Sequence, residues 1–435
     1  MDILFKNAAI LTMCDDAPVL ENGFVGVEGG FIRSVGRAEP EGAAARTIDC
    51  RGDILMPGLV NAHAHTAMCL MRGYADDYTL REWLFERVFP VEAGLGAAEI
   101  RAGAKLGFAE MIASGTTSVS DMYFHQPEVA ALAAQIGMRA SLCNGVVALD
   151  GRLDPNGRCF GELAALVRDF HGGGDGLVRA DASIHAEYTS CPEAWEKETE
   201  LALEHGLVLH LHLSETSAEH DGCIAKYGLT PARLFEKHGV FRAKTLAAHC
   251  VWLSGEDMDI LAQNGVSAAH CPVSNLKLGS GIARVSEMLR RGVNVALGTD
   301  GCCSNNSHDL FEEIKLAALL AKGTGGDPTR LPAYEALRLA TVGGAKAQGR
   351  EGQIGRVKEG YQADLILLKT DSPSMCPVYS PASAAAYAAK GSDVRLTMVR
   401  GKILYENGEF TTIDIEKAVA DARETARRIL REHTG

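Results

Sequence analysis

Two histidines separated by a single residue are the first feature of this sequence that could do chemistry. His63 and His65 close a mostly apolar run that begins after the turn residues Pro57-Gly58, a pattern typical of a buried strand. Residues i and i+2 of a strand point to the same face, so the two imidazole rings would meet at one place. Neutral imidazole is the commonest metal ligand in proteins. The pair alone is weak evidence, and it predicts a metal site only if the rest of the chain supplies further ligands.

A second pair of histidines, His210 and His212, alternates with leucines shortly before Glu215. The two share one face of the expected strand, so spacing alone cannot decide which of them is a ligand. His212 is nearer the strand end and three residues from Glu215, which favours it; the other histidine would then be satisfied within the core. Taken alone, Glu215 is as compatible with a surface position as with a catalytic one.

A carboxylate, Asp300, ends the apolar run that begins at Leu297. Burying an unpaired carboxylate is costly, so either a metal ion or a hydrogen-bond network must receive it. Three histidines and one carboxylate would hold a metal and leave a position for water, as catalytic sites do. Such a metal lowers the pKa of that water towards ~7. His249, near the end of another apolar run, could be a fourth imidazole ligand or a group that contacts the bound hydroxide.

The elements that would position these residues repeat along the middle of the chain. Eight apolar, strand-like segments alternate there with helix-compatible stretches, which predicts a (β/α)8 barrel over residues 57–355. After the strand that begins at Gly58, the expected strands are Thr116–Tyr123, Arg139–Val147, Val178–Tyr188, Leu207–Glu215, Thr245–Leu253, Val266–Ser274 and Asn294–Asp300. Active sites of such barrels lie at the C-terminal ends of the strands. Every candidate above falls at or near such an end, and His185 lies near the end of the fourth strand.

Both ends of the chain show a different pattern, with short strands separated by glycine turns. Residues 1–56 and 356–435 therefore predict one composite β-domain built from the two ends. A helix rich in Ala, Glu and Arg is expected over residues 415–432 at the end of this domain.

The overall composition limits the partners. A formal net charge of −13 argues against nucleic acid or an anionic membrane surface, because both call for basic patches. No apolar stretch approaches the ~20 residues of a membrane span, and the first residues indicate a strand and not a signal peptide. The twelve cysteines include no CxxC pair, so we expect reduced thiols in a cytoplasmic protein.

Taken in order, these motifs resemble those of the amidohydrolase superfamily. The resemblance rests on the stretch from Pro57 to His65, His212-x-x-Glu215, His249-Cys250 and Gly298-Thr299-Asp300-Gly301. Within the superfamily, the chain is similar over essentially its whole length to the methylthioadenosine/S-adenosylhomocysteine (adenosine) deaminases, which are related to the chlorotriazine hydrolases. The resemblance implies a distorted (β/α)8 TIM barrel with a β-sandwich formed from both termini. It also implies a metal-dependent hydrolase that deaminates a 6-aminopurine nucleoside and releases ammonia.

The same resemblance implies how the metal is held. One divalent ion, usually zinc although Fe²⁺ or Mn²⁺ would suit the ligands, is expected on His63, His65, His212 and Asp300. Members with two metals carry a carboxylated lysine at the end of strand four. Here that strand ends in His185-Ala186-Glu187-Tyr188 without a lysine, so a single metal is expected.

The roles of the remaining candidates also follow from the resemblance. Glu215 would protonate the purine ring nitrogen, His249 would hold the attacking hydroxide, and Asp300 would relay a proton to the leaving amine. The nucleoside would be bound by Glu92, at the ribose hydroxyls, and contacted by His185 and Trp83.

One position departs from the family pattern. Members that accept S-adenosylhomocysteine have two arginines placed for its carboxylate, one at the end of strand three and one in the loop after it. Here Asn144 stands at the first place, and Arg152 remains in the loop. Asparagine offers a carboxylate only neutral contacts. We therefore expect adenosine, 5′-deoxyadenosine or methylthioadenosine to be preferred, unless Arg158 or another loop arginine substitutes.

Two other functional classes remain open. The same site could hydrolyse another aminated or chlorinated heterocycle, such as guanine, a pterin or a chlorotriazine, although Glu92 and His185 argue for a ribosyl substrate. A non-catalytic scaffold is the remote alternative, and the full set of ligands argues against it. Deaminases of the cytidine type are excluded, because their signature needs a Pro-Cys dipeptide that this sequence lacks. The expected partner is a small nucleoside, and the chain is expected to form a homo-oligomer.

Overall fold

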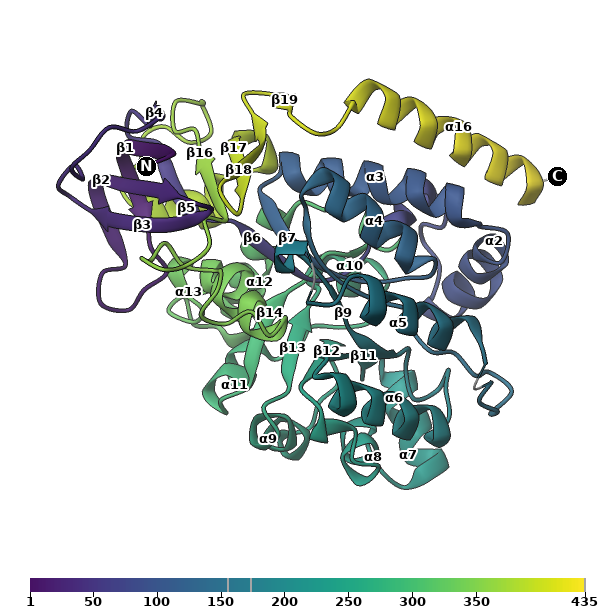
Figure 1. Ribbon diagram of the computed structural model, residues 1–435. Helices are drawn as coiled ribbons and strands as arrows, with labels where there is room; N and C mark the ends of the chain where they lie inside the picture. Colours follow the sequence, from purple (N-terminus) through teal and green to yellow (C-terminus); the bar gives the residue numbers. More distant parts are fainter. Residues whose placement is uncertain (155, 173, 434–435) are drawn as a thin grey trace.

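The computed structural model describes residues 1–154, 156–172 and 174–433, and its centre is a barrel of parallel strands (Figure 1). Two five-stranded sheets form the barrel, in the orders β10-β11-β12-β13-β14 and β15-β6-β7-β8-β9. The strands are β6 (Leu59–His65), β7 (Thr116–Met122), β8 (Arg139–Cys143), β9 (Val178–Ala180), β10 (Ala182–Ile184), β11 (Leu209–Leu213), β12 (Thr245–His249), β13 (Ser267–His270), β14 (Asn294–Leu297) and β15 (Asp300–Gly301). The structure is thus the α/β barrel that the sequence predicts.

Two of the eight predicted strands are each split in two, which distorts the barrel. The fourth strand, expected to run unbroken over Val178–Tyr188, is β9 and β10 on either side of Asp181. The backbone N–H of Asp181 still bonds to β8, whereas that of Ala182 bonds to the residue before β11. The chain therefore exchanges one neighbouring strand for the other at this point. The eighth strand is split in the same way, into β14 and β15 around Gly298-Thr299.

The second break requires a glycine. A Cβ atom on Gly298 would lie 2.8 Å from Cβ of His63 and 2.9 Å from its backbone nitrogen, so a larger residue fits only if β6 shifts. This close approach brings the chain alongside β6, where Asp300 pairs with Ala64. The carboxylate of Asp300 is thereby placed beside the histidines of β6.

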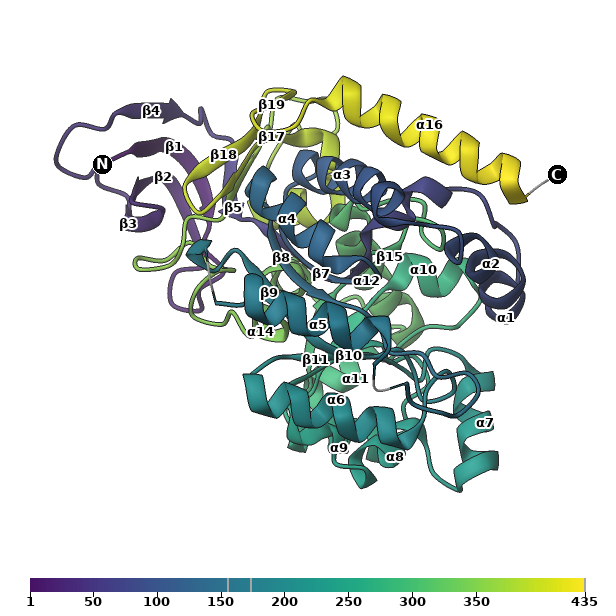
Figure 2. The same ribbon diagram turned by 45° about the vertical axis from the view of Figure 1, so that its right-hand side comes forward.

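Helices cover the outside of the barrel (Figures 1 and 2). Local sequence sets their ends: Ser254 and Asp257 form a capping box at the start of α9, and α6 ends at Gly206 with φ 65°. The helices are α1 (Leu80–Glu82), α2 (Phe89–Glu92), α3 (Ala97–Ala113), α4 (Gln126–Ile136), α5 (Arg158–Asp169), α6 (Pro192–His205), α7 (Ser217–Tyr227), α8 (Pro231–Lys237), α9 (Gly255–Gln263), α10 (Pro272–Lys277), α11 (Val285–Arg290), α12 (Leu310–Gly325), α13 (Ala333–Arg338) and α14 (Gly344–Ala347).

The two ends of the chain meet in a nine-stranded, mostly antiparallel sheet beside the barrel. Its order is β19-β18-β17-β16-β5-β1-β2-β3, with β4 paired to β1. The strands are β1 (Ile3–Leu11), β2 (Val19–Glu28), β3 (Phe31–Gly36), β4 (Arg46–Asp49), β5 (Ile54–Pro57), β16 (Leu365–Leu368), β17 (Val394–Val399), β18 (Lys402–Glu406) and β19 (Glu409–Phe410). Side chains from both ends, such as Phe5, Ile32, Leu365 and Met398, share one apolar core. The domain boundaries at residues 56/57 and 355/356 stay a prediction. Residues 434 and 435, the last two of the predicted composite β-domain, lie outside the described part of the chain.

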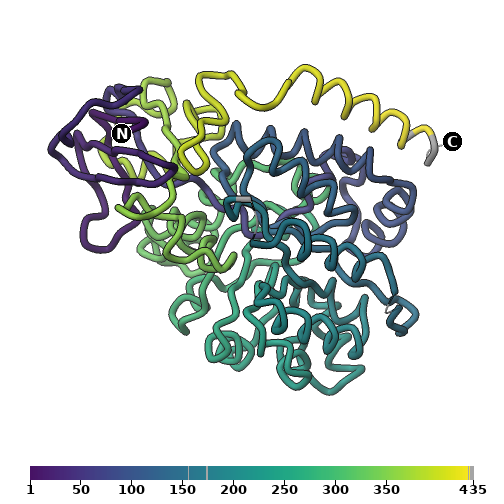
Figure 3. The backbone as a smooth tube through the Cα atoms, viewed as in Figure 1, coloured from purple at the N-terminus to yellow at the C-terminus, as the bar shows by residue number. Residues whose placement is uncertain are grey.

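The last helix, α16 (Ile415–His433), returns from this sheet to the barrel. It packs on α3, far from β1 and β2 (Figures 1 and 3). In the part of the chain that the structure describes, no helix is both long and apolar enough to cross a membrane.

Candidate active site

A cavity lies at the C-terminal ends of the barrel strands, where the sequence places its candidates. One wall is apolar and is formed by Met68, Leu80, Leu84, Phe89, Tyr188 and Leu278. Nine predicted site residues also line it: His65, Trp83, Glu92, Asn144, His185, His212, Glu215, His249 and Asp300. The cavity therefore combines an apolar surface with a polar floor, the usual composition of a small-molecule site.

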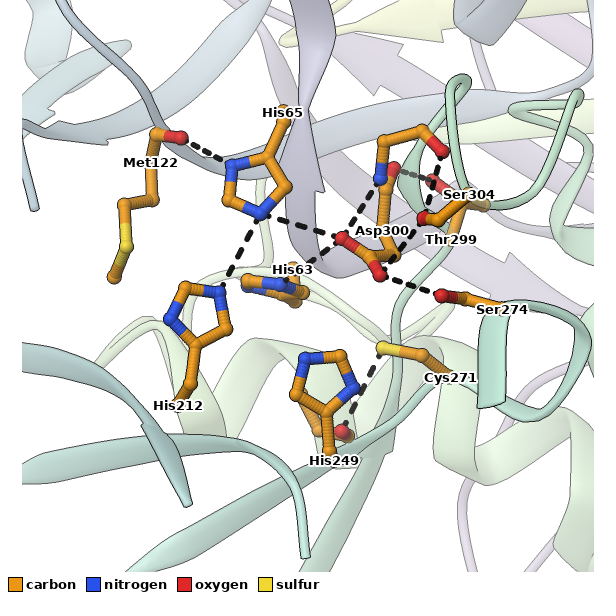
Figure 4. A network of polar contacts seen from close by, with 12 residues as sticks. His63, His65, Met122, His212, His249, Cys271, Ser274, Thr299, Asp300 and Ser304 are labelled. Carbon is orange, nitrogen blue, oxygen red and sulfur yellow. Dashed lines mark hydrogen bonds and ion pairs between the residues drawn. The ribbon is translucent and has the colours of Figure 1, made fainter. Parts of the chain in front are cut away.

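Three histidines and one carboxylate converge at the C-terminal ends of the barrel strands (Figure 4), and all of them except His63 line the cavity. Nε2 of His65 lies 3.4 Å from Nε2 of His212 and 3.2 Å from Oδ1 of Asp300. Nε2 of His63 lies 3.5 Å from the same oxygen. These four side chains come from β6, β11 and β15, and they are the four predicted metal ligands.

The opposite edge of each ring is held, which aims Nε2 at the centre. Nδ1 of His65 bonds to the carbonyl of Met122, and Nδ1 of His212 lies 2.7 Å from the carbonyl of His185. A carbonyl only accepts, so both rings carry a proton on Nδ1, and Nε2 is the ring atom that turns toward the centre. Nδ1 of His63 lies 2.9 Å from Nε2 of His210. The spacing could not decide whether His210 is a ligand. In the structure, His210 contacts the Nδ1 side of the candidate ligand His63.

The charge and hydrogen bonding of this cluster fit a divalent cation. Nε2 of His63 is buried and makes no hydrogen bond within the described structure. Burial lowers the pKa of His63 to about 4 and that of His212 well below its usual range, so both rings are neutral. Burial would also lower the pKa of His65, but the hydrogen bond and charge of Asp300 raise it to about 9. At neutral pH, His65 therefore carries a second ring proton, on Nε2. A divalent cation would replace that proton, because metal binding and protonation compete for the same lone pair.

Strained backbone accompanies these strand ends. Ser214, His249, Cys250 and Asp300 have φ of 48°, 72°, 52° and 61°, the left-handed region that costs a non-glycine residue free energy. Ser214 follows β11, His249 ends β12 and Cys250 follows it, and Asp300 begins β15. The barrel imposes these conformations at the strand ends that carry the site. They cost conformational free energy and orient the side chains.

Glu215 is a buried acid at the edge of the cluster. Its Oε1 accepts a hydrogen bond from the Ser280 hydroxyl at 3.3 Å, and its Oε2 lies 3.7 Å from Nε2 of His249. Burial, followed by the negative charge of Asp300, raises the pKa of Glu215 to about 8. The side chain is therefore protonated at neutral pH and can donate into the cavity.

His249 is oriented by a residue to which the sequence assigned no role. The amide nitrogen of Asn275 lies 3.0 Å from Nδ1 of His249. An amide N–H donates, so Nδ1 accepts and the ring proton is on Nε2, which faces the cavity. Nε2 of His249 can therefore donate into the cavity. His249 also belongs, with His63 and Asp300, to a group of ligand atoms that lie within 4.8 Å of one another.

The predicted nucleoside contacts lie on the cavity wall. Glu92 accepts a hydrogen bond from the hydroxyl of Tyr123 at 2.6 Å, and burial raises the pKa of its carboxyl. Nδ1 of His185 lies 2.8 Å from the Thr189 hydroxyl, and burial lowers the pKa of this ring to about 3. Trp83 is buried beside them.

The two residues expected to bear on the 5′ substituent lie apart. Asn144 lines the cavity, and its amide donates to Oε2 of Glu162 at 2.9 Å. Arg152 is exposed in the loop after β8 and is not among the residues that line the cavity. Arg158 lies 3.6 Å from Glu162, so it faces a carboxylate that is already present.

Several supporting residues could not be assigned from sequence. Oδ2 of Asp300 accepts hydrogen bonds from Ser274 at 2.6 Å and from Ser304 at 3.0 Å. Ser274 and Asn275 are neighbours in Ser274-Asn275-Leu276-Lys277, a motif that also fits the amidohydrolase pattern. This motif was the signal by which the two residues could have been found. Their partners, Asp300 and His249, are brought to them only by folding.

Comparison with known proteins identifies the family of the chain. Residues 54–404 match the Amidohydrolase family. The chain belongs to this family. It is 43% identical over 435 residues to a 5-methylthioadenosine/S-adenosylhomocysteine deaminase of Acetivibrio thermocellus, covering 99% of this chain and 100% of that protein. It is 45% identical over 433 residues to a 5′-deoxyadenosine deaminase of Methanosarcina acetivorans, covering 99% and 98%.

Solved structures of similar amidohydrolases contain zinc. An adenosine deaminase from Xanthomonas campestris with bound zinc superposes with a TM-score of 0.92 at 36% identity, over 98% of each chain. An atrazine chlorohydrolase from Arthrobacter aurescens complexed with zinc gives 0.90 at 28% identity, over 98% and 100%. Together with the donor set described above, these findings support a divalent metal in this enzyme.

Proposed function

We propose that this amidohydrolase is a zinc-dependent deaminase of 6-aminopurine nucleosides with a small, uncharged 5′ group. The observation that carries the proposal is the buried Glu215 carboxyl, whose pKa burial raises, beside a set of metal-competent histidines and Asp300. The full-length relatives named as deaminases of adenosine derivatives supply the substrate class. The products are ammonia and the corresponding inosine analogue.

His63, His65, His212 and Asp300 would hold one metal ion. When bound, such an ion lowers the pKa of a water and stabilises negative charge that develops during hydrolysis. Its ligands are fixed before substrate arrives, because carbonyls and neighbouring side chains already orient three of the rings.

Protons are moved by Glu215 and Asp300. As water adds to the amino-bearing ring carbon, Glu215 donates its proton to the adjacent ring nitrogen, so negative charge does not accumulate on the purine. The ionised Asp300 takes a proton from the attacking water and passes it to the amine, which leaves as ammonia. The remaining proton on the added oxygen is released as the carbonyl forms and restores the acid form of Glu215. His249 donates from Nε2 to the attacking oxygen and stabilises the tetrahedral intermediate.

The rest of the cavity selects the nucleoside. The carboxylate of Glu92 can accept from ribose hydroxyls, and the apolar wall receives the purine. Near Asn144, the carboxylate of Glu162 lies within hydrogen-bond distance of the asparagine amide. Glu162 also accepts the backbone N–H groups of His125 and Gln126, and Arg158 lies 3.6 Å from it. These donors are already engaged with Glu162, so a carboxylate on the 5′ group of the substrate would meet negative charge here, which disfavours S-adenosylhomocysteine.

The test is an ammonia-release assay with zinc-loaded protein. The substrates are adenosine, 5′-deoxyadenosine, methylthioadenosine, S-adenosylhomocysteine, guanine and a chlorotriazine, compared by kcat/KM. We expect the first three to exceed S-adenosylhomocysteine by roughly one to two decades, the value of one charged hydrogen bond. A tenfold preference for S-adenosylhomocysteine would contradict the 5′ assignment, and turnover confined to guanine or the triazine would contradict the nucleoside assignment.

The ligand set is tested by His212→Ala. We expect this variant to lose both bound metal and activity, because one of four donors and the lone pair aimed at the centre are removed. The matched control is His238→Ala, since His238 lies near the surface beside Glu196 and far from the strand ends. A His212→Ala protein that keeps its metal and its activity would refute the assignment.

A further inference from the structure

A second cluster of metal-ligating side chains lies behind the candidate active site. It consists of Cys69, Cys302 and His308, whose ligand atoms all lie within 4.8 Å of one another. The two sulfur atoms are 3.3 Å apart. All three side chains are buried, and none of them is among the residues that line the cavity. The cluster shares no residue with the groups of nitrogen and oxygen donors in the active site.

One donor of this cluster, Nε2 of His308, has no hydrogen-bond partner outside the cluster among the described residues. Nδ1 of His308 lies 2.9 Å from the hydroxyl of Thr299, while its Nε2 is buried and makes no hydrogen bond within the described structure. The Thr299 hydroxyl has an acceptor of its own in the carbonyl of Asp300, at 3.3 Å. Nδ1–H of His308 can therefore donate to Thr299, which leaves a lone pair on the buried Nε2.

The surrounding charges suit two thiolates and a cation. Nη2 of Arg72 lies 3.5 Å from Sγ of Cys69, but Arg72 also pairs with Glu110, which accepts the backbone N–H of His308 at 3.0 Å. The Arg72–Glu110 pair is neutral in sum. Two thiolates would thus leave a charge of −2 in a buried place, and a divalent ion neutralises it.

We propose that Cys69, Cys302 and His308 bind a thiophilic metal ion of the zinc class. Soft thiolate ligands select zinc or copper(I) over harder cations, and two cysteines with one histidine form an established zinc ligand set. Binding displaces the thiol protons to solvent. The ion would join the turn after His65, which carries Cys69, to the turn after Asp300, which carries Cys302.

The sulfur separation favours a bridging ion over a disulfide. Two sulfurs at about 2.3 Å from one tetrahedral ion lie about 3.8 Å apart, so the observed pair must open by only about 0.5 Å. A disulfide needs about 2.05 Å, so the same pair would have to close by more than about 1 Å. All twelve cysteines lie in the described part of the chain and are free thiols.

The test uses the full-length protein, freed of metal and then titrated with Co²⁺ under reducing conditions. We expect a thiolate-to-cobalt charge-transfer absorption band, which a site of histidine and carboxylate donors does not give. Protein purified with zinc should contain about two ions per chain, and the Cys69→Ala/Cys302→Ala variant about one. Elemental analysis of the purified protein distinguishes zinc from copper.

The matched control is Cys271→Ala, because Cys271 lies beside the active site (Figure 4) but outside the cluster. This variant should keep the charge-transfer band. Loss of the band in Cys271→Ala with retention in the double variant would overturn the proposal. Wild-type protein that contains one ion per chain and shows no charge-transfer band would also overturn the proposal. That result does not depend on the folding of any variant. A Cys69–Cys302 disulfide found by mass mapping would also overturn it.

Discussion

The proton on Glu215 is the smallest feature on which the proposed reaction depends. The side chain is buried, and its pKa of about 8 arises first from burial and then from the charge of Asp300. A cation bound to Asp300 offsets that charge and lowers the pKa from this value. The acid form is the active one, so activity is present at low pH and is lost as pH rises through the pKa of Glu215.

We therefore predict that kcat/KM falls on the alkaline side with a midpoint at or below about pH 8. Glu215→Gln preserves the shape of the side chain but removes the titrating proton. Its metal content should be unchanged, while kcat falls by about 10²–10⁴-fold, the typical contribution of a general acid. The measurements are a pH–rate profile and metal analysis of both proteins.

The control for this prediction is Glu92→Gln, in the same cavity. Glu92 is assigned to ribose binding, so this variant should raise KM and keep the alkaline limb where it is. Metal loss in Glu215→Gln would make Glu215 a ligand, and an unchanged kcat would remove it from the mechanism.

For individual residues, the sequence predicted which side chains come together but not how each ring is oriented. The HxH spacing and the strand-end positions of His212 and Asp300 were enough to bring four donors to one place. The roles of His210 and Asn275 could not be predicted, because each forms a hydrogen bond to a histidine ring that is distant in the sequence. No spacing rule reports such a contact.

Among the elements, the split strands matter most for the site. The fourth and eighth strands were predicted as continuous, although Asp181 interrupts the apolar run of the fourth and Gly298 that of the eighth. The exchange is decided by the register of β8 and β11 around Asp181, which is a tertiary property. The strand positions themselves were predicted well, since long apolar runs with glycine turns are strong local signals.

The break at Gly298 yields a prediction for this element. Gly298→Ala places a Cβ 2.8 Å from Cβ of His63, so β6 or the break must move. We expect a loss of about 1–3 kcal/mol in the free energy of unfolding, typical of overpacking, together with weaker metal binding. Denaturant unfolding and a metal-competition titration would measure the two effects.

Gly323→Ala in α12 is the matched substitution. A Cβ there meets nothing within 4 Å, so this change should leave metal binding unchanged and stabilise the helix by about 0.5–1 kcal/mol. If Gly298→Ala behaves like Gly323→Ala, the close approach to His63 does not position the site.

In the whole molecule, the barrel and the terminal sheet are joined by a buried ion pair. Arg139 begins β8, and its Nε lies 2.7 Å from Oδ2 of Asp364, just before β16. Its Nη2 also donates to Oδ1 of Asp364 at 2.9 Å and to Gln362 at 2.8 Å. Both charged side chains are almost fully buried. The predicted meeting of the two chain ends was readable from strand patterns, but this pair was not, since its partners are 225 residues apart.

Breaking the pair tests how strongly the two parts depend on each other. Asp364→Ala leaves the guanidinium of Arg139 buried without its carboxylate, so we expect a loss of about 3–5 kcal/mol in the free energy of unfolding. The matched control is Glu406→Ala, which breaks the half-exposed pair with Arg46 and should cost only about 0–1 kcal/mol. Denaturant unfolding would be followed by circular dichroism and by loss of deaminase activity. Because β8 belongs to the barrel, we expect both probes to shift together in Asp364→Ala. Activity that survives at denaturant concentrations where the ellipticity change is half complete would show that the barrel holds its site without the terminal sheet.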